Sequence, residues 1–389
     1  NVLFEFTDAN DPDIGSVLTA PTLVKLRVPG TSGSPDTYKW FVAVGSGYNN
    51  YKADGAASTT GAQAMFFLSL DKAANEPWQL NTNYFKVVLP VASTTVANGL
   101  MNPGTLTGPN GVTTLLYAGD LQGNLWKFDL SAGINASNLA ASVFQSGGSY
   151  KPLFIASTTV SGTTTLQPIT TTPQIVEANA KGYMVVFGTG KFVEPSDTTT
   201  AGQQSIYGIW DSLETTAADF TVPRTKLYQR VATLTGTTVT LSTPTFTFGL
   251  TTGNYRGWYI DLPATRERIA VEPALGIGIV AFRAAIPEGT CSGDGSQRPY
   301  CLNPVFGTGL GCDMTATPGI PSAPKIFQIE LDSPYSPRSP SGGRTVTIKQ
   351  QVVGSSTKIT DAGNVLVTGQ NVQNIVIPAG RMSWRELRQ

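Results

Sequence analysis

Histidine is absent from all 389 residues, so the commonest general base and the commonest zinc or copper ligand are both missing. Catalytic mechanisms that pair serine, cysteine or a metal with histidine are therefore excluded. The 26 basic and 26 acidic residues cancel, so no long-range field attracts nucleic acid or an anionic membrane. No stretch approaches the roughly 18 apolar residues that cross a bilayer as a helix. We expect no nucleic-acid partner and no membrane span.

Charged residues are scarce as well, at 13% of the chain, whereas about a quarter is usual in soluble domains. Glycine and proline are abundant, with 41 and 26 residues, and runs of threonine and serine separate short apolar segments. This composition argues against a helical bundle, a coiled coil or a charged disordered chain.

Strand signals recur along the chain as short runs rich in Val, Ile, Phe, Tyr and Thr, bounded by Gly, Asn, Asp or Pro. The clearest runs are 40–44, 65–70, 113–118, 125–130, 183–187, 205–210, 258–262, 277–282 and 325–331. Short helical turns are expected only near residues 213–218 and 384–387. The sequence therefore predicts an all-β fold.

One unit repeats: an apolar strand, a glycine-centred turn and a second strand that ends in an acidic residue. The tightest copy is LLYAGDLQGNLWKFD at residues 115–129, with further copies in 41–71, 185–211 and, more loosely, 277–332. A period of roughly 40 to 50 residues is typical of β-propeller blades, because each small sheet needs a neighbour on both faces. We predict one modified β-propeller domain over residues 1–389, with about seven blades and long loop insertions.

All three cysteines, Cys291, Cys301 and Cys312, lie in residues 287–324, which are rich in Gly and Pro. This region shows no strand pattern and is predicted to be a long insertion closed by a disulfide in an oxidising compartment. The sequence does not decide which two cysteines pair, and it leaves the third thiol unassigned. Residues 332–343 read as an exposed linker, and residues 344–389 as closing strands with a C-terminal segment.

A tight turn is predicted within the 115–129 segment. Asp120 follows Gly119 there, and Gly123 is expected to supply a positive φ. We predict that the Asp120 carboxylate accepts backbone N–H bonds within the turn, which is a structural role. No catalytic and no cofactor-binding residue is assigned anywhere in the chain.

The weak candidates for a metal site are Asp8, Asn10, Asp11 and Asp13, which place three carboxylates within six residues. Pro12 interrupts the alternating spacing of an EF-hand-like calcium loop. Capping of turns is therefore the preferred role of these acids, and no metal site is assigned.

Six stretches, in order along the chain, resemble the C-terminal propeller of the PilC/PilY family of type IV pilus biogenesis and tip-adhesin proteins. They are residues 4–15, 45–51, 117–129, 186–192, 257–261 and 380–386. The resemblance implies an extracellular protein, exported through the periplasm to the cell surface or pilus tip. It also implies pilin or minor pilins and a host or abiotic surface as partners, with possible self-association.

The sequence departs from this family at one place. Members carry a calcium loop of alternating aspartates just before the equivalent of residues 117–129, whereas residues 101–113 of this chain contain no carboxylate. Calcium prefers six to eight oxygen ligands, several of them anionic. We therefore expect no calcium at this loop, and no other cofactor.

The C-terminal segment carries Arg381, Arg385 and Arg388 beside Glu386. These arginines form either a solvated tail or, by the resemblance, a surface that docks onto a pilin or a neighbouring subunit.

The function that the sequence favours is a non-enzymatic module that promotes pilus assembly or opposes retraction and mediates surface attachment. Two alternatives stay open. One is a structural subunit of an extracellular fibre or sheath, joined through exposed strand edges. The other is a quinone-dependent propeller dehydrogenase, because residues 117–129 also resemble, more distantly, the blade repeat of quinoprotein-like propellers.

Overall fold

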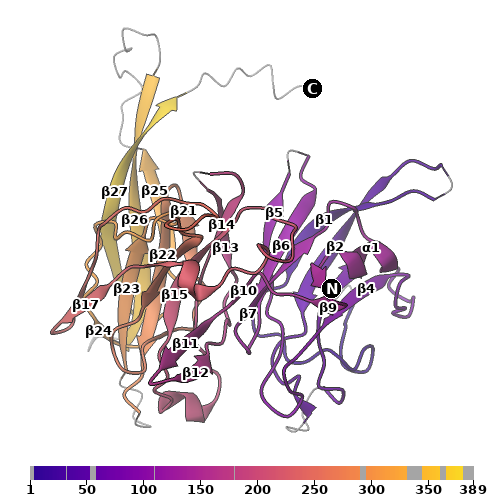
Figure 1. The fold of residues 1–389 in the computed structure, drawn as a ribbon, viewed down its shortest axis with the longest axis horizontal. Helices are drawn as coiled ribbons and strands as arrows, with labels where there is room; N and C mark the ends of the chain where they lie inside the picture. Colours follow the sequence, from indigo (N-terminus) through magenta and orange to yellow (C-terminus); the bar gives the residue numbers. More distant parts are fainter. Residues whose placement is uncertain are drawn as a thin grey trace.

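Small antiparallel sheets make up almost all of the regular structure. The computed structural model describes residues 4–31, 33–52, 58–108, 110–178, 180–289, 295–330, 344–359 and 365–379. Five sheets of three or more strands follow one another in chain order, and Figure 1 shows them side by side from the first sheet on the right to the last on the left.

The first sheet has the order β1 (Thr22–Val28), β2 (Thr37–Gly45), β3 (Gln63–Ser69), β4 (Tyr84–Leu89). The second has the order β10 (Phe154–Ile155), β7 (Asn124–Asp129), β6 (Thr113–Gly119), β5 (Gly104–Thr107). The third has the order β13 (Gln174–Glu177), β14 (Tyr183–Gly188), β15 (Ser205–Asp211), β19 (Gly257–Asp261), β16 (Tyr228–Gln229), where only the β16–β19 pair is parallel.

The fourth sheet has the order β20 (Arg268–Ile269), β22 (Ile279–Ile286), β23 (Ser296–Leu302), β24 (Thr317–Pro318), with β21 (Ala274–Gly276) also paired to β22. The fifth has the order β25 (Lys325–Glu330), β26 (Arg344–Ile359), β27 (Val365–Ala379). Hairpins β8–β9 (Gln145–Ser146, Ser149–Tyr150), β11–β12 (Ser157–Val160, Thr163–Leu166) and β17–β18 (Ala232–Thr235, Thr238–Leu241) stand apart. The described helices are α1 (Ala136–Ala141) and the 3-10 turns η2 (Pro195–Thr198) and η3 (Arg224–Lys226).

Each inner strand sends alternate side chains into two different cores. In β6, Leu116 and Ala118 pack against the first sheet, whereas Leu115 and Tyr117 pack against the third. Strand β14 repeats the pattern: Val185 and Phe187 pack against the second sheet, whereas Met184 and Val186 pack against the fourth. Successive side chains of a strand point to opposite faces, so a strand buried on both faces reads as a continuous apolar run. This packing explains why LLYAG and YMVVFG contain almost no polar residue.

The all-β class is confirmed, and every predicted strand run overlaps an observed strand. The number of about seven blades is not confirmed, because the described ranges form five sheets of three or more strands. None of the described helices is long and apolar enough to cross a membrane.

A helical turn near residues 213–218 is present, although it starts later than expected: the Thr216 carbonyl accepts the N–H groups of Asp219 at 3.2 Å and Phe220 at 3.0 Å. Leu213 precedes this turn and is not helical, because it adopts a left-handed backbone conformation with φ 63° and its N–H donates to the Asp211 carboxylate at 2.9 Å. The other expected helical turn, at residues 384–387, lies outside the described residues.

The prediction that residues 287–324 lack strands is wrong, because β23 pairs with β22 from Ser296 to Leu302. The sequence did not predict this strand because Arg298 and Pro299 lie in its middle, and neither residue is usual in a buried central strand. Strand β24 pairs only with Ser296 and Gln297, so Pro299 has no partner strand on that side among the described strands. The predicted closing strands after residue 344 lie within β26 and β27, whereas residues 332–343 and 380–389 lie outside the described residues.

Cys301 at the end of β23 forms a disulfide with Cys312, with a Cα–Cα distance of 5.9 Å and a sequence separation of 11. Cys291 lies outside the described residues. The bridge closes the loop that follows β23, and the Cys301 carbonyl also accepts the N–H of Leu310 at 2.8 Å.

We predict that Cys312→Ser lowers the free energy of unfolding by about 3 kcal/mol, because a loop of this length is constrained in the unfolded chain. Urea denaturation measures the change, and Cys291→Ser is the matched control, expected to lie within about 0.5 kcal/mol of the wild type. Peptide mapping without reduction would contradict this pairing if it linked Cys291 to either of the other cysteines.

Candidate functional site

Asp120 is a fully buried carboxylate that receives five hydrogen bonds. Its Oδ1 accepts the backbone N–H groups of Gln122 at 2.9 Å and Asn124 at 2.8 Å. Its Oδ2 accepts three side-chain donors, from Gln63 at 3.0 Å, Asn124 at 2.8 Å and Trp126 at 2.8 Å. Because Gln63 belongs to β3, this carboxylate joins the first sheet to the second.

The two glycines beside Asp120 make the turn possible. Gly123 has φ 82°, which disfavours any residue with a side chain. A Cβ at Gly119 would lie 2.2 Å from the Ile169 side chain. Burial raises the pKa of the Asp120 carboxyl above its ordinary value, and the donors from Trp126, Asn124 and Gln63 oppose that rise. The carboxylate has no exposed surface, so all five of these hydrogen bonds lie inside the fold.

We predict that Asp120→Asn lowers the free energy of unfolding by about 2–4 kcal/mol, because either amide orientation places an NH₂ group against buried donors. Asp129→Asn is the matched control, since Asp129 is exposed and accepts one bond, from Ser131 N–H at 3.0 Å. The control should change stability by less than about 1 kcal/mol. Equal urea midpoints for the two variants would contradict the role of Asp120.

Asp11 and Asp13, two of the weak metal candidates, hold a lysine between them. The Lys86 ammonium of β4 lies 2.8 Å from Asp11 Oδ1 and 2.6 Å from Asp13 Oδ2. Tyr84 donates its hydroxyl to Asp11 Oδ2 at 2.9 Å, and Thr60 donates to Asp13 Oδ1 at 2.6 Å. An ammonium thus occupies the position between the carboxylates. We call residues 4–16 together with Lys86 the N-terminal clamp.

The N-terminal clamp covers the outer face of the first sheet. Phe6 packs edge-on against Phe66, Trp78 and Tyr84, with ring centroids 5.1–5.5 Å apart. The indole of Trp78 donates to the Glu5 carbonyl at 2.6 Å. The other two candidates, Asp8 and Asn10, are exposed, and Asn10 Oδ1 accepts the Thr7 N–H at 2.9 Å. In the described ranges, no group of three or more Asp, Glu or Cys side chains could hold a metal ion.

Burial alone would lower the pKa of Lys86, but the hydrogen bonds and charges of Asp11 and Asp13 raise it above its ordinary value. Because the pKa of Lys86 is higher in the folded protein than in the unfolded chain, its ion pairs stabilise the fold fully below about pH 10. This stabilisation is lost as the pH rises through the folded-state pKa of Lys86.

We predict that Lys86→Met lowers the free energy of unfolding by about 3–5 kcal/mol at neutral pH, because two buried carboxylates lose their cation. The loss of stability above about pH 10 should be smaller in this variant than in the wild type. Hydrogen exchange and limited proteolysis of residues 4–16 measure whether the clamp detaches.

Lys39→Met is the control, since Lys39 pairs with Asp71 at 3.3 Å on the exposed surface and should contribute less than about 1 kcal/mol. Unchanged protection of residues 4–16 in Lys86→Met would contradict the clamp.

Residues 101–113 are the stretch at which we expect no calcium. The described part of residues 101–113 contains β5 and the start of β6, with no carboxylate. Its buried Asn102 uses both ends of its amide: Oδ1 accepts the Gly45 N–H at 3.0 Å, and Nδ2 donates to Thr19 at 2.8 Å. Arg381, Arg385 and Arg388 lie outside the described residues.

The sequence did not reveal two buried ion pairs, because the partners in each pair are far apart in the chain. Asp211 Oδ2 of β15 lies 2.6 Å from the Lys127 ammonium of β7 and accepts the Tyr117 hydroxyl at 2.6 Å. Burial, followed by the Asp211 charge, raises the pKa of Tyr117 far above its ordinary value, so this phenol stays protonated. In the fourth sheet, Glu267 Oε1 lies 2.9 Å from Arg298 Nε and accepts the Tyr300 hydroxyl at 2.8 Å.

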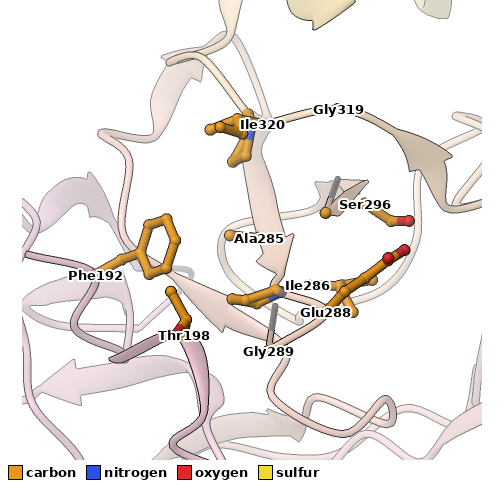
Figure 2. A pocket seen from close by; sticks show the side chains of 12 residues that line it. Phe192, Thr198, Ala285, Ile286, Glu288, Gly289, Ser296, Gly319 and Ile320 are labelled. Carbon is orange, nitrogen blue, oxygen red and sulfur yellow. The ribbon is translucent and has the colours of Figure 1, made fainter. Parts of the chain in front are cut away.

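A small apolar cavity of about 60 Å³ opens between the third and fourth sheets. Figure 2 shows Phe192 and Thr198 on one side, Ile320 on another, and Ile286 and Glu288 below. These residues come from three segments: the loop after β14, the β22–β23 connection and the chain after β24. Phe192 and Ile320 are 36% and 43% exposed, which is unusual for apolar side chains beside a cavity. We call this feature the Phe192 pocket.

The walls of the Phe192 pocket are fixed by hydrogen bonds to the framework. Arg268 Nη1 donates to the Lys191 carbonyl at 2.9 Å, and Asp197 Oδ2 accepts the Val193 and Glu194 N–H groups at 2.9 Å. On the opposite wall, the Gly319 N–H donates to the Gly295 carbonyl at 2.7 Å. Arg266 Nη1 donates to the Glu288 carbonyl at 2.9 Å. The pocket is therefore largely formed before any ligand enters.

A family model described as the PilY1 β-propeller domain matches residues 36–244. The type IV pilus biogenesis factor PilY1 of Pseudomonas aeruginosa is 28% identical over 427 aligned residues, covering 99% of this chain and 33% of the relative. A PilY1 homologue of Xylella fastidiosa is 28% identical over 332 residues, covering 79% of this chain and 20% of the relative. The chain thus spans about a third or less of the length of these relatives.

The crystal structure of the P. aeruginosa PilY1 C-terminal domain superposes with a TM-score of 0.61 at 23% sequence identity. The match covers 95% of this chain and 75% of that domain. At 23% identity this match supports the fold alone, and together with the family model it confirms the predicted β-propeller architecture.

Proposed function

This chain belongs to the PilY1 β-propeller family, and from that premise we propose that it serves type IV pilus biogenesis as a non-enzymatic assembly and attachment domain. The observation that carries the proposal is the match to the family model over residues 36–244, joined with the alignment of a pilus biogenesis factor to 99% of the chain. In this role the domain promotes pilus assembly or opposes retraction.

The proposed absence of catalysis is supported by how the buried ionisable groups are used. Asp120, Asp211 and Glu267 each accept several internal hydrogen bonds and connect elements of the fold. The Phe192 pocket is mainly apolar and contributes one carboxylate, Glu288, at its rim. Such a pocket suits the binding of an apolar group.

The proposed location is outside the cell, at the cell surface or pilus tip. The expected partners are pilin or minor pilins and a host or abiotic surface. The Cys301–Cys312 disulfide supports an oxidising compartment. We propose that calcium does not control this domain through residues 101–113, because that stretch offers no anionic ligand and the Asn102 amide is already used.

A second candidate, a subunit of an extracellular fibre, is favoured by one observation. Strand β27 is the outer strand of the fifth sheet, and its 15 residues include no charged residue. Long uncharged edge strands are prone to pair with a further strand, because proteins usually protect such edges with charges. Sedimentation of the purified chain distinguishes the two candidates, since a fibre subunit assembles on its own.

We predict that deleting the gene for this chain in its bacterium abolishes surface pili and reduces surface attachment, and that the wild-type gene restores both. Electron microscopy counts the pili. Removing the retraction motor in the same strain separates the two modes of action: pili return if the domain opposes retraction and stay absent if it promotes assembly. Wild-type piliation and attachment in the deletion strain would contradict the proposed function.

A further inference from the structure

The Phe192 pocket is the described surface feature best suited to holding part of another molecule. Three apolar residues near it are substantially exposed: Phe192 at 36%, Val193 at 45% and Ile320 at 43%. Phe192 and Ile320 lie on two sides of the hollow, with Ile286 below them (Figure 2), and Pro287 also lines it. Exposed apolar groups grouped around a hollow mark binding sites more often than scattered ones do.

The size of the pocket limits what can enter. A cavity needs about 10–15 Å³ to hold one water molecule, so a cavity of about 60 Å³ accepts about four heavy atoms. Four carbons are the side chain of leucine or isoleucine. The hollow is too small for a sugar ring, and its lining offers few polar groups to orient one.

The charge at the rim adds a second requirement. The Glu288 side chain is exposed, and the described residues provide it with no salt bridge. Arg266 binds the backbone carbonyl of Glu288, which leaves the carboxylate available to an incoming cation. An opposite charge beside an apolar anchor is a common way for a protein surface to select a peptide.

We propose that the Phe192 pocket binds a partner polypeptide through one leucine or isoleucine side chain followed by a lysine or arginine that pairs with Glu288. The walls need little rearrangement, because the hydrogen bonds of Arg268, Asp197 and Gly319 already fix the three segments. A preformed pocket reduces the entropy lost on binding, so a single anchor side chain can contribute much of the affinity.

Three capped hexapeptides test the proposal with the purified chain: Ser-Gly-Leu-Lys-Gly-Ser, its Leu→Ala form and its Lys→Glu form. Methyl NMR of Ile286, Ile320 and Val193 reports binding at the pocket. We expect the Leu-Lys peptide to bind with Kd of about 1 mM, the alanine peptide about tenfold or more weaker, and the glutamate peptide about threefold weaker.

Variants of the chain separate the anchor from the charge. Phe192→Ser removes one wall and should weaken the Leu-Lys peptide about tenfold. Glu288→Lys should reverse the preference, so that the Leu-Glu peptide binds better than the Leu-Lys peptide. Val231→Ser and Glu76→Lys are the matched controls, an exposed apolar and an exposed acidic residue outside the pocket, and both should bind as the wild type does.

Several outcomes would overturn the proposal. One is the absence of methyl shifts at about 10 mM peptide, and another is equal binding of the leucine and alanine peptides. A third is an unchanged charge preference in Glu288→Lys. Shifts that appear with short-chain phosphatidylcholine but not with peptide would identify a lipid occupant, and shifts that depend only on protein concentration would identify a second copy of the chain. The test uses the purified chain, so its result does not depend on whether the domain acts in pilus biogenesis.

Discussion

Mutual burial of neighbouring sheets is the constraint on which the other features of this molecule depend. Strands such as β6 and β14 have no polar face, because their alternate side chains enter two different cores. Removing one sheet would therefore expose the face of the next. Polar side chains buried between the sheets, such as Lys127 of β7 and Arg298 of β23, must find partners within the fold. The positions of Asp120 and Asp211, one just after β6 and one at the end of β15, follow from this constraint.

Buried carboxylates join the sheets that the apolar cores hold together. Asp120 receives Gln63 from the first sheet, and Asp211 receives Lys127 from the second. Buried ion pairs add little net stability, because desolvation offsets much of their attraction. Their directional bonds connect particular residues of neighbouring sheets. Arg268 of the fourth sheet likewise donates to the Lys191 carbonyl in the loop after β14, and this contact holds one wall of the Phe192 pocket.

Local patterns made much of the fold predictable from the sequence, and distance along the chain limited the rest. The strand runs and the Asp120 turn depend on neighbouring residues, so apolar runs and glycines indicated them. Strand β23 was missed because Arg298 and Pro299 mask its pattern, although a buried Glu267 partner and an edge position accommodate them. The pairing of Lys86 with Asp11 spans 75 residues, and the Phe192 pocket draws on three separate segments. No local signal in the sequence marks either of them.

The N-terminal clamp determines how a mechanical load would pass through this domain. A pull at Phe4 would act first on the ring contacts of Phe4 and Phe6 with Trp78, and then on the two ion pairs to Lys86. Lys86 lies on β4, whose neighbour β3 is paired along nearly its whole length. Tension on these contacts would therefore enter the first sheet through β4, its outer strand, and not through the cores between the sheets.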